Sequence, residues 1–323
     1  MSRVMNYFNK HIIITGAAGF IGSSLVEFLL KNGGYKITCI DNFDDYYDIS
    51  AKQKNIAAFE NHANIRFLKI DIRNADELNK NLCDDYDIIV HLAAKAGVRQ
   101  SILQPNLYEQ TNVAGTLNLL EFAKQKNVKQ FVFASSSSIY GVNPDVPWRE
   151  TSALMPVSPY AATKIAGEYL GYTYSKLYDI RFIALRFFTV YGAKQRPDLA
   201  IHKFTELITK NNPITLYGNG DTFRDYTYID DILSGIAAAI NYDKTMFETI
   251  NLGNNHTVGL LDLVATLENV IGKKAIAQFD KLHPADSPRT FADITKAKKL
   301  LNYNPQTQLN DGIRKFYEWY VNN

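Results

Sequence analysis

The stretch HIIITGAAGFIG, residues 11–22, decides the fold of this chain. A run of β-branched residues ends at Thr15, glycines follow at positions 16, 19 and 22, and a helical pattern begins at Phe20. Glycine permits a tight turn and a close approach of backbone to a ligand, and a helix N-terminus offers free N–H groups. This order predicts a binding site for the diphosphate of a dinucleotide. The alternative is a tight strand-to-helix turn without a ligand.

Outward from this stretch, short apolar runs alternate with helical patterns. The runs lie at residues 35–41, 65–71, 86–93, 130–135 and 181–190, and the helical patterns lie near 20–32, 74–83, 106–126 and 159–178. Apolar strands separated by helices predict a Rossmann-type α/β fold, in which a doubly wound parallel sheet is covered on both faces.

After about residue 190 the segments shorten and turn residues become more frequent. We therefore expect a dinucleotide-binding domain over residues 1–190, with segments near 229–255 that return to its sheet. A smaller C-terminal lobe is expected over residues 191–323. Because no linker rich in Pro, Gly or Ser separates the halves, the lobes should share an interface with a cleft between them.

The composition disfavours several classes of function. Lys and Arg number 35 against 33 Asp and Glu, so the net charge of +2 offers no basic stripe for nucleic acid and no polybasic membrane anchor. No apolar run reaches the roughly 18 residues that span a bilayer, and the start lacks the apolar core of a signal peptide. We expect a cytoplasmic protein with reduced cysteines. The six histidines are scattered, so no metal is expected.

Asp41 ends the second predicted strand about twenty residues after the glycine turn. A carboxylate at this place accepts hydrogen bonds from the ribose hydroxyls of a dinucleotide and repels a 2′-phosphate. Since no arginine follows it, the sequence favours NAD over NADP. Asp71 ends the third predicted strand in the same way. It either holds the adenine amino group or caps the next helix.

Tyr160 and Lys164 stand at positions i and i+4 of a helical pattern, so both lie on one face. A cation beside a phenol lowers the phenol pKa, and a phenolate takes a proton from a hydroxyl while a hydride leaves the same carbon. Tyr172 and Lys176 repeat the spacing, but they lie about 120° further around the axis and cannot face the same site. Ser158-Pro159 favours the first pair by setting the helix start. The second pair is expected at a surface or interface.

Four serines, Ser135 to Ser138, follow the buried strand at 130–135. Side chains at the carboxyl end of a parallel strand point into the crevice where ligands bind. With the glycine turn and the Tyr–Lys pair, the chain resembles the extended short-chain dehydrogenases/reductases nearly end to end. Among them it is most similar to UDP-glucuronate 4-epimerases. The segments that carry this resemblance are 93–105, 134–141, 158–164, 185–198 and 223–231.

The resemblance implies a catalytic triad of Ser136, Tyr160 and Lys164, although neighbouring serines leave the first member open. It also implies a tightly bound NAD. Besides Tyr160 and Lys164, the residues implied as NAD contacts are Gly16, Gly19, Phe20, Ile21, Gly22, Asp41, Asn42, Asp71, Ile72, Leu92, Ala93, Ala94, Lys95, Thr111 and Phe188. Thr111 departs from the asparagine of several relatives.

The substrate residues are also implied by the resemblance. Thr215 and Tyr217 would flank the uracil, and Arg224 and His283 would meet the diphosphate, although many relatives have arginine at position 283. Thr189 and Arg196 occupy the positions that glucuronate epimerases use for the sugar carboxylate, which suits a guanidinium fork. Arg99 is characteristic of these epimerases but has no evident role. Ser136, Ser137 and Ser138 would line the sugar site.

The implied reaction is 4-epimerisation of a UDP-sugar, with UDP-glucuronate converted to UDP-galacturonate through a 4-keto intermediate. Dehydratases of the family carry Asp-Glu where this chain has Ser137-Ser138, so elimination lacks its acid and base. The alternatives are UDP-glucose or UDP-N-acetylhexosamine epimerisation, a nucleotide-sugar 4-keto reductase, and an NAD-binding sensor. A homodimer built from the helical stretches 106–126 and 158–178, and a role in polysaccharide biosynthesis, are expected by resemblance alone.

Overall fold

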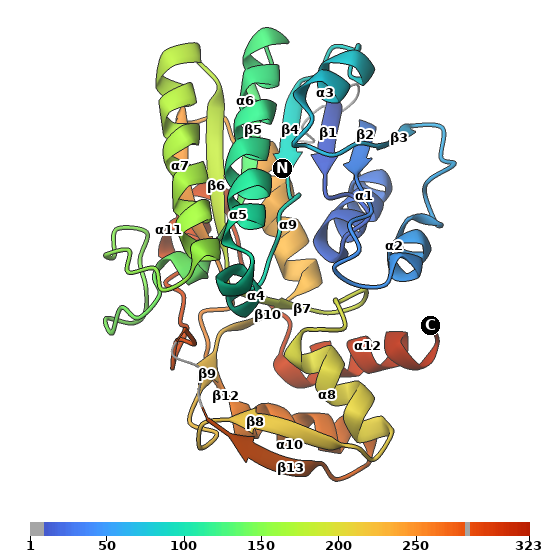
Figure 1. Cartoon of the computed structure of the whole chain (residues 1–323), viewed down its shortest axis with the longest axis vertical. Coiled ribbons are helices and arrows are strands. Elements are labelled where there is room, and N and C mark those ends of the chain that lie inside the picture. Colours follow the sequence, from blue (N-terminus) through green and yellow to red (C-terminus); the bar gives the residue numbers. More distant parts are fainter. Residues whose placement is uncertain (1–9, 282–284) are drawn as a thin grey trace, which may run out of the picture.

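The structure is a computed structural model that describes residues 10–281 and 285–323. Its centre is a seven-stranded parallel sheet in the order β11-β6-β5-β4-β1-β2-β3 (Figure 1). The bounds are β1 (His11–Thr15), β2 (Lys36–Asp41), β3 (Ile65–Lys69), β4 (Ile88–His91), β5 (Gln130–Ser136), β6 (Arg181–Phe187) and β11 (Phe247–Leu252). The predicted Rossmann-type fold class is confirmed.

Helices cover both faces of the sheet. Ile12 and Ile14 of β1 belong to one apolar core, whereas Ile13 between them belongs to a second. This alternation follows because successive side chains of a strand point to opposite faces. The first core includes α1 (Phe20–Asn32), α9 (Ile229–Ile240) and α11 (Thr295–Leu301), and the second includes α3 (Ala75–Asn81), α6 (Gly115–Gln125) and α7 (Pro159–Tyr178).

The helical pattern over residues 106–126 is interrupted in the structure. After α4 (Val98–Leu103), it forms α5 (Pro105–Glu109), a π-helical turn η1 (Gln110–Ala114) and α6. Asn112 in this turn donates hydrogen bonds of 3.0 Å to the carbonyl oxygen of Lys95 and to the hydroxyl of Thr163 on α7. The π-helical turn thereby ties α7 to the loop after β4, and such turns are frequent at functional sites.

Two further elements differ from the predicted pattern. The apolar run at 181–190 ends as β6 at Phe187 and resumes as β7 (Thr189–Tyr191), which pairs with β10 (Tyr226–Tyr228) outside the main sheet. An unpredicted helix, α2 (Ile49–Ile56), begins after Asp48, whose carboxylate accepts the N–H of Ser50 at 2.8 Å. Both elements bring side chains to the carboxyl ends of the parallel strands.

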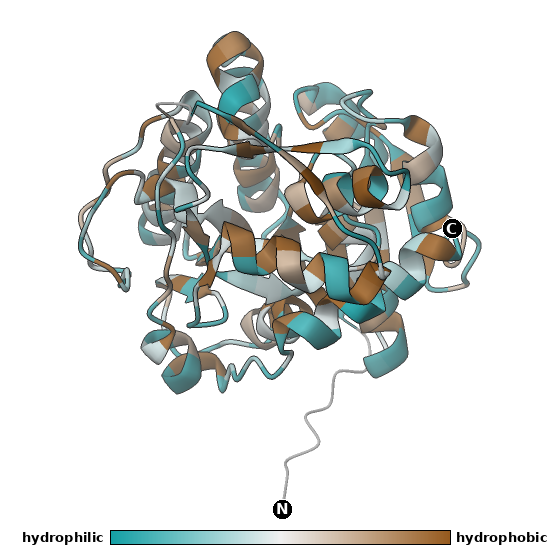
Figure 2. Cartoon of the chain, turned by 90° about the horizontal axis from the view of Figure 1, so that it is seen from below, coloured by the Kyte–Doolittle hydropathy of each residue, from teal (hydrophilic) through white to brown (hydrophobic). Residues whose placement is uncertain are grey.

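The later part of the chain forms short strand pairs and amphipathic helices below the main sheet (Figure 1). Its elements are α8 (Ala200–Thr209), β8 (Pro213–Tyr217), β9 (Phe223–Arg224), β12 (Val258–Gly259), α10 (Leu260–Ile271), β13 (Ile276–Asp280) and α12 (Leu309–Val321). Figure 2, seen from below, shows hydrophilic and hydrophobic residues mixed along the helices. The segment α9 to β11 lies with the main sheet, where β11 pairs with β6. The domain boundary at residue 190 stays a prediction.

Within residues 10–281 and 285–323, no helix combines the length and the apolar character that a membrane span requires.

Candidate active site

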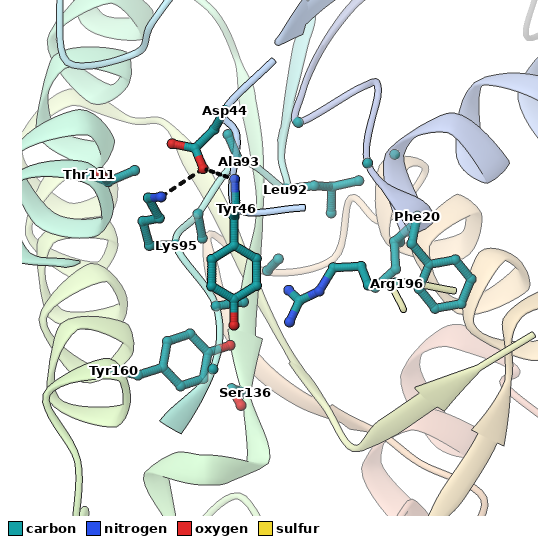
Figure 3. A pocket seen from close by; sticks show the side chains of 18 of the residues that line it. Phe20, Asp44, Tyr46, Leu92, Ala93, Lys95, Thr111, Ser136, Tyr160 and Arg196 are labelled. Atoms are coloured by element: carbon teal, nitrogen blue, oxygen red, sulfur yellow. Dashed lines mark hydrogen bonds and ion pairs between the residues drawn. The ribbon is translucent and has the colours of Figure 1, made fainter. Parts of the chain in front are cut away.

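A cavity of about 460 Å³ lies at the carboxyl ends of the parallel strands. Its walls come from the ends of β2, β5 and β6 and from the turns that follow β1, β3 and β4. All residues that the resemblance implied as NAD contacts line this one cavity, as do Ser136, Ser137, Ser138, Thr189 and Arg196. The parallel sheet therefore brings six strand ends to one edge, where they meet side chains from η1, α7 and the loop after β7 (Figure 3).

The glycine turn after β1 leaves no room for side chains at two of its three positions. Gly16 has a φ of +71°, and a Cβ there would lie 2.8 Å from the backbone nitrogen of Ala93. A Cβ on Gly22 would lie 2.1 Å from the carbonyl oxygen of Gly16. Gly19 caps α1 without a side chain, and Phe20 and Ile21 of its first turn line the cavity. This geometry fits an anionic group held on backbone N–H groups.

Asp41 lies buried at the end of β2, beside the glycine turn. Its carboxylate accepts the N–H groups of Ala18, at 3.0 Å, and of Phe43, at 2.8 Å. The ammonium group of Lys52 on α2 lies 3.8 Å from the same carboxylate and is also buried. Asp41 therefore braces the turn while its side chain lines the cavity.

Asp71 is held by polar neighbours rather than by the next helix. Arg73 donates to both of its carboxylate oxygens, and Asn42 donates to one of them at 3.0 Å. Burial opposes ionisation of Asp71, but these hydrogen bonds outweigh it and lower the pKa of the carboxyl group to about 2. The helix-cap alternative is wrong, because Asn74 caps α3 by accepting the N–H of Glu77.

Tyr160 and Lys164 both reach the cavity from the first turns of α7. Ser158 begins this helix, and its hydroxyl accepts the N–H of Ala161 at 3.2 Å. The Lys164 ammonium donates to the carbonyl oxygen of Ala134 at 2.7 Å and lies 5.9 Å from the centre of the Tyr160 ring. Figure 3 shows the Tyr160 hydroxyl beside Ser136.

The serines after β5 have different partners. The Ser136 hydroxyl interacts with the Ser138 hydroxyl and accepts the Ser138 N–H, both at 3.1 Å. The Ser135 hydroxyl instead donates to the buried carboxylate of Glu168 at 2.5 Å. Ser136 also favours the ionised form of Tyr160 through a side-chain hydrogen bond. The sequence alone left these serines equivalent, and these contacts distinguish Ser136 from Ser135.

Burial dominates the ionisation of the Tyr–Lys pair. It raises the pKa of Tyr160, while the hydrogen bond from Ser136 and the charge of Arg196 act in the opposite direction. Burial also lowers the pKa of Lys164 to about 7, against the charge of Glu168, which raises it. The predicted lowering of the Tyr160 pKa is therefore wrong for the chain by itself. A lowered pKa of Lys164 weakens its support for a phenolate, because the neutral amine carries no charge.

The second Tyr–Lys pair lies outside the cavity, as predicted. Tyr172 is 46% exposed, and the Lys176 ammonium lies 5.5 Å from the centre of its ring.

Arg196 reaches the cavity from the loop after β7. Its Nε and Nη2 groups donate to the two carboxylate oxygens of Asp198, at 2.9 and 2.7 Å. Its guanidinium carbon also lies 5.1 Å from the centre of the Tyr46 ring. Figure 3 shows Tyr160 and Arg196 entering from opposite walls of the cavity. The fork predicted to bind a sugar carboxylate thus holds a carboxylate of the chain itself.

Among the described residues, those implied for the nucleotide do not line the cavity. Arg99 donates to Asp286 at 2.6 Å and lies over the Tyr217 ring at 4.0 Å, so it joins α4 to the lower lobe. Arg224 donates to the carbonyl oxygens of Phe223 and Pro288, and burial lowers its pKa. Thr215 lies on β8, paired with β13. His283 lies outside the described residues.

Six polar or charged side chains that the sequence analysis did not single out also line the cavity: Asp44, Tyr46, Tyr47, Lys52, Arg73 and Asp198. Asp44 accepts from the Lys95 ammonium at 2.7 Å, which holds the loop after β2 against the loop after β4. The hydroxyl of Tyr47 is buried without a hydrogen-bond partner among the described residues. The signal for this loop was the density of aromatic and acidic residues in NFDDYYD, residues 42–48, directly after Asp41.

No group of acidic, histidine or cysteine side chains suited to a metal ion occurs in the described parts of the chain.

Comparisons with known proteins agree with this geometry. The family model described as GDP-mannose 4,6 dehydratase matches residues 13–316. A UDP-glucuronate 4-epimerase of Thermodesulfobacterium geofontis is 42% identical over 96% of this chain and 95% of the relative. The crystal structure of UDP-glucuronic acid 4-epimerase from Bacillus cereus, in complex with UDP-glucuronic acid and NAD, is 38% identical. It superposes with a TM-score of 0.90 and covers 97% of this chain and 99% of its own.

A relative with another substrate is also similar. The UDP-N-acetylglucosamine 4-epimerase of Methanobrevibacter ruminantium is 29% identical with a TM-score of 0.89, over 98% of this chain and 99% of its own.

Proposed function

Because the chain belongs to the extended short-chain dehydrogenase/reductase family, we propose that it is an NAD-dependent UDP-glucuronate 4-epimerase that interconverts UDP-glucuronate and UDP-galacturonate. One observation carries the proposal. The glycine turn, Tyr160, Ser136 and the Arg196 guanidinium line a single cavity, so a dinucleotide, a proton acceptor and a carboxylate-binding group are brought together. Ser137 and Ser138 stand where elimination would need carboxylates.

The residues present fit NAD. The turn at Gly16 and Gly22 is too tight for side chains, as a backbone cradle for a diphosphate requires, and the Asp41 carboxylate ends β2 where ribose hydroxyls are bound. When bound, NAD would supply a reversible acceptor for the hydrogen and electron pair that C4 of the sugar loses. Lys164, Thr111 and Phe188 also line the cavity and would contact the bound NAD.

Tyr160 is the proton acceptor and donor of the proposed mechanism. Its phenolate takes the proton of the 4-hydroxyl as the sugar is oxidised, and the phenol returns it after the 4-keto sugar has turned its other face. Because burial raises the pKa of Tyr160, ionisation depends on the hydrogen bond from Ser136 and on nearby positive charge from Lys164 and Arg196. The reaction consumes no cofactor, since the sugar is reduced again in the second half.

Arg196 and Thr189 bind the sugar carboxylate in this proposal. The Nη1 group of Arg196 is not engaged by Asp198, and the substrate carboxylate exchanges with or joins the carboxylate of Asp198. Arg224 is suited to the diphosphate, because its half-buried guanidinium donates to main-chain carbonyls and forms no ion pair with a described residue. Thr215 and Tyr217 flank the uracil.

We further propose a cytoplasmic homodimer that serves polysaccharide biosynthesis. An apolar face on α4, α6 and α7 supports the dimer: Leu103 is 74% exposed, Tyr169 is 66% exposed and Leu177 is 65% exposed, and Leu117 and Tyr172 are also exposed. α6 and α7 lie side by side (Figure 1), so two copies can bury this face as a four-helix bundle.

The test is to incubate purified protein with UDP-glucuronate, without added NAD, and to follow the anomeric signals by NMR. Appearance of UDP-galacturonate is the expected result, and it shows retained cofactor as well. Turnover of UDP-glucose or UDP-N-acetylglucosamine instead would overturn the role of Arg196. Stoichiometric loss of added NADH or NADPH with a 4-keto sugar would indicate a reductase.

A further inference from the structure

Glu168 is a buried carboxylate that the proposed mechanism does not use. It lies on α7 one turn after Lys164 and is 5% exposed. Its two oxygens accept hydrogen bonds from Nε and Nη2 of Arg186, at 2.9 and 2.7 Å, and from the hydroxyl of Ser135 at 2.5 Å. Both ions of this pair are nearly excluded from solvent.

Arg186 is in turn held on its other side. Its Nη1 group donates to the hydroxyl of Tyr140 at 2.8 Å and to the carbonyl oxygen of Glu150 at 3.0 Å. The Tyr140 hydroxyl donates to Asn251 of β11 at 2.7 Å. One polar network therefore joins α7 to β5, β6 and β11. A buried ion pair is often no more stabilising than apolar side chains of the same size. Stability alone therefore does not explain the Glu168–Arg186 pair, and a role in positioning its neighbours can be tested.

The network touches the catalytic face at the end of β5. Ser135 stands between Ala134, whose carbonyl oxygen accepts from the Lys164 ammonium at 2.7 Å, and Ser136. Glu168 and Lys164, one turn apart on α7, thus bind neighbouring residues of this strand end: Glu168 binds the Ser135 hydroxyl, and Lys164 binds the Ala134 carbonyl oxygen. The same helix carries Tyr160, Lys164 and Glu168 on successive turns.

Few charges act on Lys164 in its buried setting. On α7 they are Tyr160 and Glu168, and from β4 it is His91. Burial, together with the charge of Lys164, lowers the pKa of His91 to about 3, so that ring is neutral at physiological pH. Arg186 of β6 is paired with Glu168. Glu168 therefore supplies the negative charge that favours the protonated form of Lys164.

We propose that Glu168, anchored by Arg186, is a positioning residue of the reaction: it holds the strand end Ala134–Ser136 in place and keeps its negative charge beside the ammonium group of Lys164. This inference rests on the proposed function. Its chemical consequence is that the positive charge that supports the Tyr160 phenolate depends on a carboxylate that touches neither sugar nor cofactor.

The test compares Glu168→Gln with Ser135→Ala. Glutamine keeps the size of the side chain but removes its charge, whereas alanine at 135 removes one hydrogen bond and no charge. The titration of Lys164 is followed by NMR of protein with isotope-labelled lysine, which needs no substrate. The alkaline limb of kcat against pH is measured in parallel with UDP-glucuronate.

In Glu168→Gln we expect the Lys164 titration midpoint and the alkaline limb to move to lower pH together, by about one unit. In Ser135→Ala both should stay within about 0.3 units while kcat falls about threefold. The control Glu248→Gln, which removes the ion pair with Lys296 away from the cavity, should change neither. An unchanged midpoint in Glu168→Gln, with only a lower melting temperature, would overturn the proposal.

Two measures keep the outcomes separate. Glu168→Gln leaves the Arg186 charge buried and unpaired, so the double variant Glu168→Gln/Arg186→Met is measured as well. It should melt closer to the wild type and still show the lowered midpoint. If the wild-type protein fails to convert UDP-glucuronate, the proposed function fails, but the NMR titration still decides whether Glu168 sets the charge of Lys164.

Discussion

The two Tyr–Lys pairs of α7 have the same spacing on the same helix and opposite surroundings. Tyr160 and Lys164 line the cavity, and Lys164 is 4% exposed with its ammonium bound to the end of β5. Tyr172 and Lys176 lie at the surface, about three turns later. The spacing of a motif thus states only that two side chains share a face. A Tyr–Lys pair can act in catalysis only if its face of the helix is turned toward the carboxyl edge of the sheet.

We expect the largest difference in kcat between the two pairs when the tyrosine hydroxyl is removed. Tyr160→Phe should lower kcat for UDP-glucuronate by about 10³-fold, because the proton of the 4-hydroxyl loses its acceptor. Tyr172→Phe should stay within about twofold of the wild type. Initial rates by NMR decide this, with retained NAD measured in both proteins. A Tyr160→Phe protein with a tenth of the wild-type rate would remove Tyr160 from the mechanism.

Replacing the lysines should give a smaller difference in kcat between the two pairs. Lys164→Met removes a charge and the hydrogen bond to Ala134, and we expect kcat to fall about 10²-fold with a smaller amount of NAD retained after purification. Lys176→Met should leave both quantities unchanged. Equal losses in the two variants would mean that the effect arises from the helix as a whole and not from the cavity.

The dependence of the free energy of unfolding on pH should also distinguish the two Tyr–Lys pairs. The pKa of Lys164 is lowered to about 7 in the folded chain, whereas an unfolded lysine titrates near 10.4. Between these values the unfolded state binds more protons, so the contribution of Lys164 makes the wild type more stable as pH rises from 7 to 10. Relative to Lys164→Met, the free energy of unfolding should therefore rise over this range, by up to about 4 kcal/mol. Urea unfolding at pH 7, 8, 9 and 10 tests this, with Lys176→Met as the matched control.

The difference between the spacing of residues and the face on which they lie also explains which site residues could be predicted from the sequence. Strand-end residues such as Gly16, Asp41 and Ser136 were placed correctly beside one cavity, because a parallel sheet brings the carboxyl ends of its strands to one edge. Asn112 and Lys52 were not foreseen. Their positions depend on a π-helical turn and on an extra helix, which are set by tertiary hydrogen bonds and not by periodicity.

The lower lobe was the least predictable part. Arg99, Tyr217 and Asp286 come from segments far apart in the sequence, and neither a repeat nor a sheet register relates them. The prediction of the Tyr160 pKa was wrong for a related reason. The i and i+4 spacing predicted that Lys164 is a neighbour of Tyr160. The pKa shift is dominated by burial, however, and burial is a property of the folded chain.

The smallest expected effect on chemistry belongs to the surface pair, where Tyr172 should act on assembly. Tyr172→Glu places a charge among the exposed apolar side chains of α7, and desolvating that charge disfavours a helix bundle. We expect the dimer to dissociate in analytical ultracentrifugation at micromolar concentration, with kcat changed by at most about threefold. Tyr160→Phe should leave the dimer intact. A Tyr172→Glu protein that stays dimeric would exclude this face, whereas a dissociated and inactive protein would mean that the cavity needs the second copy and that the two regions of α7 are coupled.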